Sequence, residues 1–109
     1  MPAFRDMSMT PGDTTTSVSF TTNITAYSSS WQDFLTNWTA PANGYLKVTL
    51  DATTTPAAYL KDNTNGFEVR ENGNGSRAIY IWIPCARGHK YSGGCVYCKT
   101  TGIAFYPAY

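Results

Sequence analysis

One run of side chains in the sequence has the composition of a zinc site. Within fourteen positions the chain carries all three of its cysteines and its one histidine: Cys85, His89, Cys95 and Cys98. Three thiolates and one imidazole are a legitimate tetrahedral ligand set for zinc. The spacing between them is not one of the common structural arrangements. Cys95 and Cys98 also fall in a predicted strand, where side chains three positions apart point to opposite faces.

We therefore favour a protein without a cofactor, in which Cys85, Cys95 and Cys98 are inert thiols, with zinc kept as the alternative. An odd number of cysteines and an N-terminus without a signal-peptide pattern predict reduced thiols. A disulfide between Cys95 and Cys98 along one strand would strain its geometry.

Catalytic patterns are scarce. A Ser-His-Asp arrangement would have to use His89, and the sequence contains no Gly-x-Ser-x-Gly elbow. The seven carboxylates are scattered among predicted turns, although Asp51, Asp62 and Glu68 could approach one another. The sequence thus predicts that the protein is not an enzyme. A hydrolase would need acids that converge near His89 in a cleft.

Composition excludes several further classes. A chain of 109 residues is one domain, and a net charge of +1 with 14% charged residues lacks the basic footprint of a nucleic-acid-binding protein. No apolar run is long enough to insert in a membrane as a helix. Aromatic residues reach 15%, and eight of them are tyrosines, which favours β structure.

Alternating apolar residues and closely spaced turn residues predict an all-β fold. We expect a single antiparallel β-sandwich, jelly-roll-like, of seven or eight short strands in 17–109. The segment 78–83 is apolar on both faces and is predicted to be a central strand that Pro84 ends. The spacing of apolar residues in 31–39 is ambiguous between helix and strand, and the segment is interpreted as a strand or an irregular edge. The predicted strands are 18–24, 31–39, 45–50, 57–61, 67–70, 78–83, 91–99 and 103–106, with a turn at 100–102 before the last.

Residues 1–16 show no regular period and are predicted to be an extended N-terminal arm. The only apolar side chains of this arm are Phe4, Met7 and Met9. These three residues are candidates for attachment to a partner surface, and the alternative is a disordered terminus.

Tyrosines on the predicted strands point to a contact surface. Tyr45, Tyr80 and Tyr106 lie in strands whose opposite face is already apolar. A small sandwich cannot bury both faces within itself, so we expect another chain to cover part of this surface.

Three segments resemble a known family: WTAPANGYLKV at 38–48, IYIWIPCARGHKY at 79–91 and IAFYPAY at 103–109. Over residues 31–109 the chain resembles small bacteriophage virion modules, which occur as tail-fibre tips, head fibres and capsid decoration proteins. Cys85 and His89 depart from that pattern, since members more often have valine and an acidic residue there. The cysteines at 95 and 98 are also outside it.

This resemblance implies a homotrimer with a jelly-roll head similar to the tumour-necrosis-factor architecture. The expected trimer contacts are Tyr45, Tyr80, Phe105 and Tyr106. The expected function is that of a structural protein of the virion, assembled in the bacterial cytoplasm and attached to the capsid or another virion protein by the N-terminal arm. The alternative is a tail-fibre tip that binds a host surface glycan through Trp31, Trp38 or tyrosines.

Overall fold

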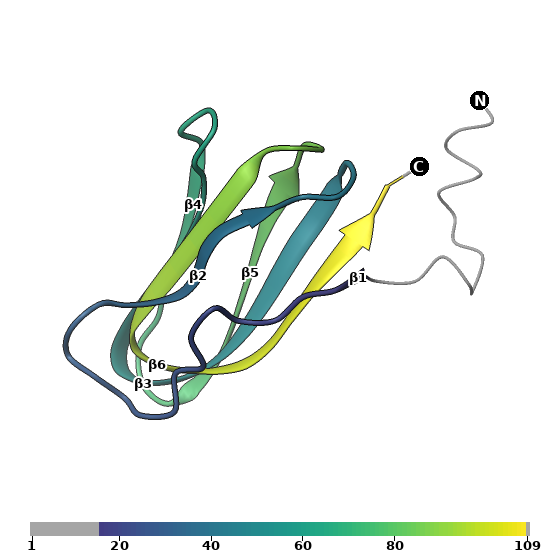
Figure 1. Ribbon diagram of the computed structural model, residues 1–109. Helices are drawn as coiled ribbons and strands as arrows, with labels where there is room; N and C mark the ends of the chain where they lie inside the picture. The colour runs from purple at the N-terminus through teal and green to yellow at the C-terminus, as the bar shows by residue number, and fades with distance from the viewer. Residues whose placement is uncertain (1–15, 109) are drawn as a thin grey trace.

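A computed structural model describes residues 16–108, which form one antiparallel β-sheet and contain no helix (Figure 1). The expectation of an all-β fold is therefore confirmed. Among these residues no helix is long and apolar enough to cross a membrane. The strands are β1 (Thr16–Ser17), β2 (Gln32–Thr39), β3 (Gly44–Asp62), β4 (Glu68–Asn72), β5 (Arg77–Cys85) and β6 (Lys90–Pro107).

Two long strands, β3 and β6, pair with each other and carry all the others (Figure 1). β5 pairs with the first part of β3, from Gly44 to Ala52, and β4 pairs with its last part. On the outer edge of β6, β2 pairs with the first part and β1 with the end. The sheet thus has a β5 half, which includes β1, and a β4 half, which includes β2.

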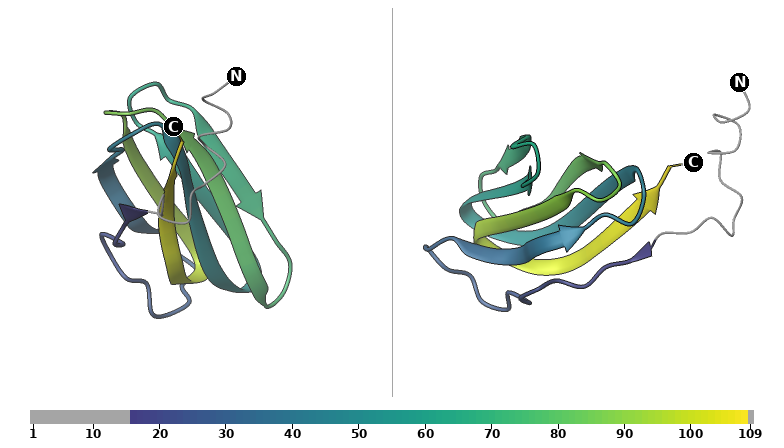
Figure 2. Two further views of the ribbon diagram at one scale, coloured as in Figure 1. Left: turned by 90° about the vertical axis from the view of Figure 1, so that its right-hand side faces the viewer. Right: turned by 45° about the horizontal axis from the view of Figure 1, so that its top comes forward.

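A bulge bends the sheet between its two halves. Ala52 pairs with Cys98 and Ala57 with Val96, so residues 53–56 of β3 face only Tyr97 of β6. Thr54 and Tyr97 both have left-handed backbone angles, with φ of 55° and 59°. An uneven insertion of this kind bends and twists a strand pair. The sheet folds over, as both views in Figure 2 show, and its halves face each other in a sandwich-like arrangement.

The hydrophobic core fills the space between the two halves. The Trp38 ring on β2 lies 5.4 Å from that of Phe105 on β6, which joins the two inner faces. On β3, Leu46, Val48 and Leu50 are all fully buried. The isoleucines of β5 at 79, 81 and 83 are buried opposite them. Buried and exposed residues therefore alternate along β5 and the first part of β3, which places one face of each strand in the core.

The number of strands differs from the prediction because two of them are long and bulged. The predicted strands 45–50 and 57–61 are parts of β3, and 91–99 and 103–106 are parts of β6. The predicted turn at 100–102 is a bulge, in which Thr101 is the extra residue between paired Gly102 and Thr100. The Thr101 hydroxyl donates to the Thr49 carbonyl at 2.7 Å, so β6 continues through this segment.

The interpretation of 31–39 as a strand is correct, and bulges explain its helix-like spacing. β2 shifts register between Asp33 and Leu35 and again between Leu35 and Trp38, and Asn37 has a φ of 52°. As a result the consecutive residues Phe34 and Leu35 are both fully buried. Such a pattern mimics a helical face although the backbone is extended.

Three other boundaries are corrected. β5 pairs with β3 alone among residues 16–108, so it is an edge strand and not a central one, and it passes through Pro84 to Cys85. An edge position tolerates proline because that side needs no backbone donor. The predicted strand 18–24 does not form, because the strand in this region, β1, ends at Ser17 and the next begins at Gln32. Ile24 is nevertheless buried in the core. Thr16 belongs to β1, and the predicted arm residues Phe4, Met7 and Met9 lie outside the described part.

Candidate interaction surface

The outer side of the β5 half carries a cluster of exposed aromatic rings. Tyr45 on β3, Tyr80 and Trp82 on β5, and Tyr106 on β6 are 50%, 56%, 47% and 39% exposed. We call these four residues the aromatic face. Strand pairing places them side by side, because residues directly opposite each other in a sheet share a face. Tyr45 is opposite Tyr106, and Trp82 and Tyr80 are opposite Lys47 and Thr49.

Lys47 lies at the centre of the aromatic face. Its ammonium is 5.2 Å from the Trp82 ring centroid and 5.5 Å from that of Tyr80, within the range of cation–π attraction. Trp82 also lies 5.7 Å from Tyr106. These contacts hold the rings in a fixed arrangement on a rigid sheet, which keeps the entropy cost of binding low.

Three of the four predicted contact residues lie on the aromatic face, and the fourth does not. Phe105 is fully buried on the inner side, opposite Leu46 and against Trp38, so its prediction as a contact between subunits is wrong. Sequence reasoning also missed Trp82. Its signal was present, because Trp82 alternates with the buried residues of β5 in phase with Tyr80.

The four proposed zinc ligands are not brought together. No group of three or more histidine, cysteine or acidic residues in the described chain could hold a metal ion. Cys95 and Cys98 are both fully buried, because the bulge at Tyr97 turns them to the same inner face. This corrects the expectation that they point to opposite sides. The hydrogen bond with Cys98, together with burial, raises the pKa of Cys95.

His89 instead pairs with a buried carboxylate. Its Nδ1 lies 2.7 Å from Asp62 Oδ2, and Asp62 is only 3% exposed. The amides of Thr64 and Asn65 donate to Asp62 Oδ1 at 2.9 and 3.3 Å. Burial acts to raise the pKa of Asp62, but the hydrogen bonds from His89, the two amides and Tyr91 outweigh it, and the pKa is lowered.

Tyr91 and Cys85 lie beside this pair, and the pKa values of both are raised. The Tyr91 hydroxyl accepts from the Ala86 amide at 2.7 Å, and burial raises the Tyr91 pKa. Cys85 lines an open hollow of about 350 Å³ together with Asp62 and Tyr91. Burial raises the pKa of Cys85 to about 12, so it stays a neutral thiol. The hydrogen bonds of Asp62, His89 and Tyr91 therefore connect the turn after β3 with the loop before β6.

Trp31 is a further exposed aromatic residue, outside the aromatic face. It lies on the outer side of the β4 half and is 48% exposed. Its ring contacts that of Tyr59 at 5.8 Å, and the Arg70 guanidinium lies 5.7 Å from its centroid. Trp38, also considered for stacking on sugars, packs on the core between Phe105 and Tyr91 and is only partly exposed.

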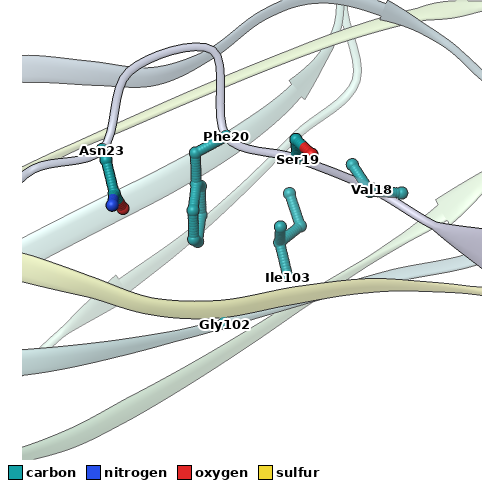
Figure 3. Close-up of a pocket in the computed structure, with 6 residues that line it drawn as sticks. All are labelled: Val18, Ser19, Phe20, Asn23, Gly102 and Ile103. Carbon is teal, nitrogen blue, oxygen red and sulfur yellow. The ribbon is translucent and has the colours of Figure 1, made fainter.

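A surface hollow of about 430 Å³ lies where residues 18–23 pass over β6 (Figure 3). Val18, Phe20 and Ile103 pack on the core here. Its lining contains no titratable side chain.

Comparison with known proteins yields no relative: no family model, no curated protein and no solved structure matches the chain.

Proposed function

We propose that the protein is a non-enzymatic structural subunit of a bacteriophage virion, which self-associates through the aromatic face. The observation that carries this proposal is β5, which is apolar on both sides but covered on only one. Large aromatic side chains held on a rigid surface are the residues most enriched at the centres of protein interfaces. A second copy of the chain is the occupant that fits the resemblance to virion modules.

Edge exposure of β5 supports the same conclusion. A nine-residue edge strand with apolar side chains is a liability in a free subunit, because its unpaired backbone groups can template aggregation. An assembly around a symmetry axis removes this liability by covering the strand. The threefold order is taken from the resemblance.

The virion assignment is supported by the resemblance and by the composition. A surface with few charges and many hydroxyl groups suits a rigid particle component. Attachment is assigned to residues 1–16, with Phe4, Met7 and Met9 as the anchoring side chains on a capsid or other virion protein.

The absence of activity is also part of this proposal. The Asp62 carboxylate accepts hydrogen bonds from the turn amides and lies 2.7 Å from His89 Nδ1, and the nearby Cys85 thiol stays protonated. The pair therefore serves to fix the structure.

Sedimentation equilibrium of the full chain tests self-association. We expect a mass of about 36 kDa, three times the 12.0 kDa of one chain. Replacing both Tyr80 and Trp82 by alanine is expected to yield monomers with unchanged β-sheet content. The matched control is Phe67→Ala, because Phe67 is 49% exposed but lies outside the aromatic face. A wild-type monomer at micromolar concentration would refute the proposal.

Copy number on particles tests the virion assignment. Phage particles purified from the source culture are analysed by quantitative mass spectrometry against the major capsid protein. Hundreds of copies support a decoration or head-fibre role, whereas a handful support a tail-fibre tip. Absence of the protein from every purified particle would refute both.

A further inference from the structure

Self-association of identical subunits limits which surfaces can meet. A twofold contact joins one surface to its own copy, whereas each contact in a closed ring of three joins two different surfaces of the chain. The aromatic face supplies one of them, and this inference rests on its proposed role in self-association. A ring therefore requires a second contact surface on each subunit.

Lys47 makes the aromatic face a poor partner for itself. Its ammonium lies among the rings of the face, close to Trp82 and Tyr80, and forms no salt bridge with any residue in 16–108. Aromatic faces packed against each other would bring these like charges together out of water, which costs free energy. A surface that combines aromatic rings with a carboxylate fits the aromatic face better.

Such a surface lies on the outer side of the β4 half. We define the Trp31 patch as Trp31, Tyr59, Arg70 and Asp33. Tyr59 on β3 is opposite Arg70 on β4 and Gly94 on β6, and Gly94 is opposite Asp33 on β2. The sheet register thus fixes the patch across four strands. Tryptophan, tyrosine and arginine are the residue types most enriched at the hot spots of protein interfaces.

Asp33 is the carboxylate of this patch that can receive a cation from another subunit. It is exposed, accepts the Tyr59 hydroxyl at 3.2 Å, and forms no salt bridge within the described chain. The nearby cations are directed to a different carboxylate, because Arg70 Nε donates to Glu68 at 2.6 Å and Lys61 is opposite Glu68. The match to the aromatic face is therefore between single charges and does not depend on net charge.

The side chains of the Trp31 patch form a stack that another subunit can cover. The Trp31 and Tyr59 rings are 5.8 Å apart, and the Arg70 guanidinium lies over both, at 5.7 and 6.0 Å. Arg70 covers part of the Trp31 ring, yet Trp31 remains 48% exposed. A flat apolar face can cover this stack while the guanidinium keeps its bond to Glu68.

The Trp31 patch and the aromatic face adjoin at one edge of the molecule. A hollow of about 270 Å³ lies between them, lined by Arg70 of β4 on one side and by Tyr80 and Trp82 of β5 on the other. The two surfaces thus flank this edge at an angle and give the subunit a wedge shape. Wedges joined flank to flank turn about an axis and can close into a ring. The edge of β5 then lies beside that axis.

We propose that the aromatic face of one subunit docks on the Trp31 patch of the next, with the Lys47 ammonium beside the Asp33 carboxylate. Each subunit contributes one surface of each kind, so that repeated contacts close the ring. The contact buries the exposed rings of both surfaces and gives each of the two charges a partner.

Mixing two variants of the full chain tests this pairing of surfaces. Tyr80→Ala/Trp82→Ala removes the aromatic face. Trp31→Ala/Arg70→Ala removes the Trp31 patch, and each variant alone should be monomeric with unchanged β-sheet content. An equimolar mixture should form a heterodimer of about 24 kDa, twice the 12.0 kDa of one chain, because each variant keeps the surface that the other lacks. Sedimentation velocity at the highest soluble concentration measures it, since a single contact lacks the gain from ring closure.

The outcomes separate this inference from the proposed self-association. If Trp31→Ala/Arg70→Ala keeps the wild-type mass while the aromatic-face variant is monomeric, self-association stands and the inference is overturned. A mixture that stays monomeric also overturns it, whereas a monomeric wild type overturns both. The matched control is Phe67→Ala, which should assemble like wild type because this exposed ring belongs to neither surface.

Exchanging the two charges tests the contact between Lys47 and Asp33. Lys47→Glu and Asp33→Lys should each weaken assembly by about tenfold or more, because each places like charges at the contact. The double variant restores opposite charges and should recover most of the loss. Sedimentation equilibrium over a dilution series measures all three. A double variant that assembles no better than the weaker single variant would overturn the pairing.

Discussion

His89 and Asp62, which are 27 positions apart, form a 2.7 Å hydrogen bond that joins the end of β3 to the start of β6. The carboxylate also accepts two backbone amides of the turn after β3. Asp62 is thus the hub of a small polar network, and it is the one charged side chain buried among residues 16–108.

This network predicts an acid-sensitive stability. The folded-state pKa of Asp62 is below its ordinary value of 3.8, so its contribution is present above that value and is lost as pH falls through the folded pKa. Asp62→Asn should lack this acid-dependent loss. Urea unfolding at fixed protein concentration, from pH 6 to pH 3, measures it. Parallel curves for the two proteins would contradict the prediction, and the exposed carboxylate variant Glu71→Gln should behave as wild type.

Phe105 and Tyr106 are neighbours that should respond differently to truncation. Phe105 is fully buried, so Phe105→Ala is expected to cost about 3–5 kcal/mol of unfolding free energy. Tyr106 is exposed on the aromatic face, so Tyr106→Ala should leave folding nearly unchanged and weaken self-association. Chemical denaturation and sedimentation distinguish the two. A Phe105→Ala protein of wild-type stability would show that its placement in the core is wrong.

Gly93 should tolerate no side chain. A Cβ there would lie 2.7 Å from both Leu60 Cδ2 and Phe34 Cε1. Gly93→Ala is therefore expected to destabilise the fold by about 1–3 kcal/mol through overpacking. Gly102→Ala is the matched control on the same strand, since nothing lies within 4 Å of its Cβ position. Equal thermal midpoints for the two variants would be inconsistent with this packing.

The cysteines should be unreactive in the folded protein. Cys85, Cys95 and Cys98 are free and buried, so Ellman's reagent should label them slowly in buffer and completely in denaturant. Elemental analysis should find no stoichiometric zinc, and a chelator should not shift the melting temperature. One zinc per chain, retained on dialysis, would restore the metal hypothesis.

Removal of residues 1–15 separates attachment from folding. The truncation keeps Thr16, which pairs with Phe105 in β1. We expect a folded, self-associating protein that no longer joins particles, measured by co-sedimentation with phage. Normal incorporation would show that the arm is not the attachment segment.

Local sequence patterns predicted where most strands lie but not their continuity. In 45–50 the apolar side of the alternation is the buried side of β3, because the strand is regular there, whereas 78–83 was predicted to be apolar on both faces and only one face of β5 is buried. The bulges at residues 53–56 of β3 and at Thr101 of β6 were missed. Pro56 lies in the first and Gly102 follows the second, and both residue types also occur where strands end. Tyr97 itself pairs with no residue of β3, and its amide donates to the Ser28 carbonyl at 2.8 Å, a contact between distant segments that no local pattern reveals.

The candidate contact residues also divide into those that sequence patterns reveal and those that only the folded structure reveals. Tyr45, Tyr80 and Tyr106 could be found from strand periodicity. Trp31 was also named from the sequence, but its contacts with Tyr59 and Arg70 could not be predicted, because the three residues come from separate segments that only the folded sheet brings together. The direction of Phe105 likewise follows from its pairing with Leu46 and not from its neighbours in sequence.

The two long strands have a mechanical consequence. Because β3 and β6 each pass through both layers, neither layer can slide or peel away without disrupting the backbone ladder of the other. Heating or mechanical pulling should therefore unfold the subunit in a single cooperative step. Such behaviour suits a subunit that experiences mechanical force.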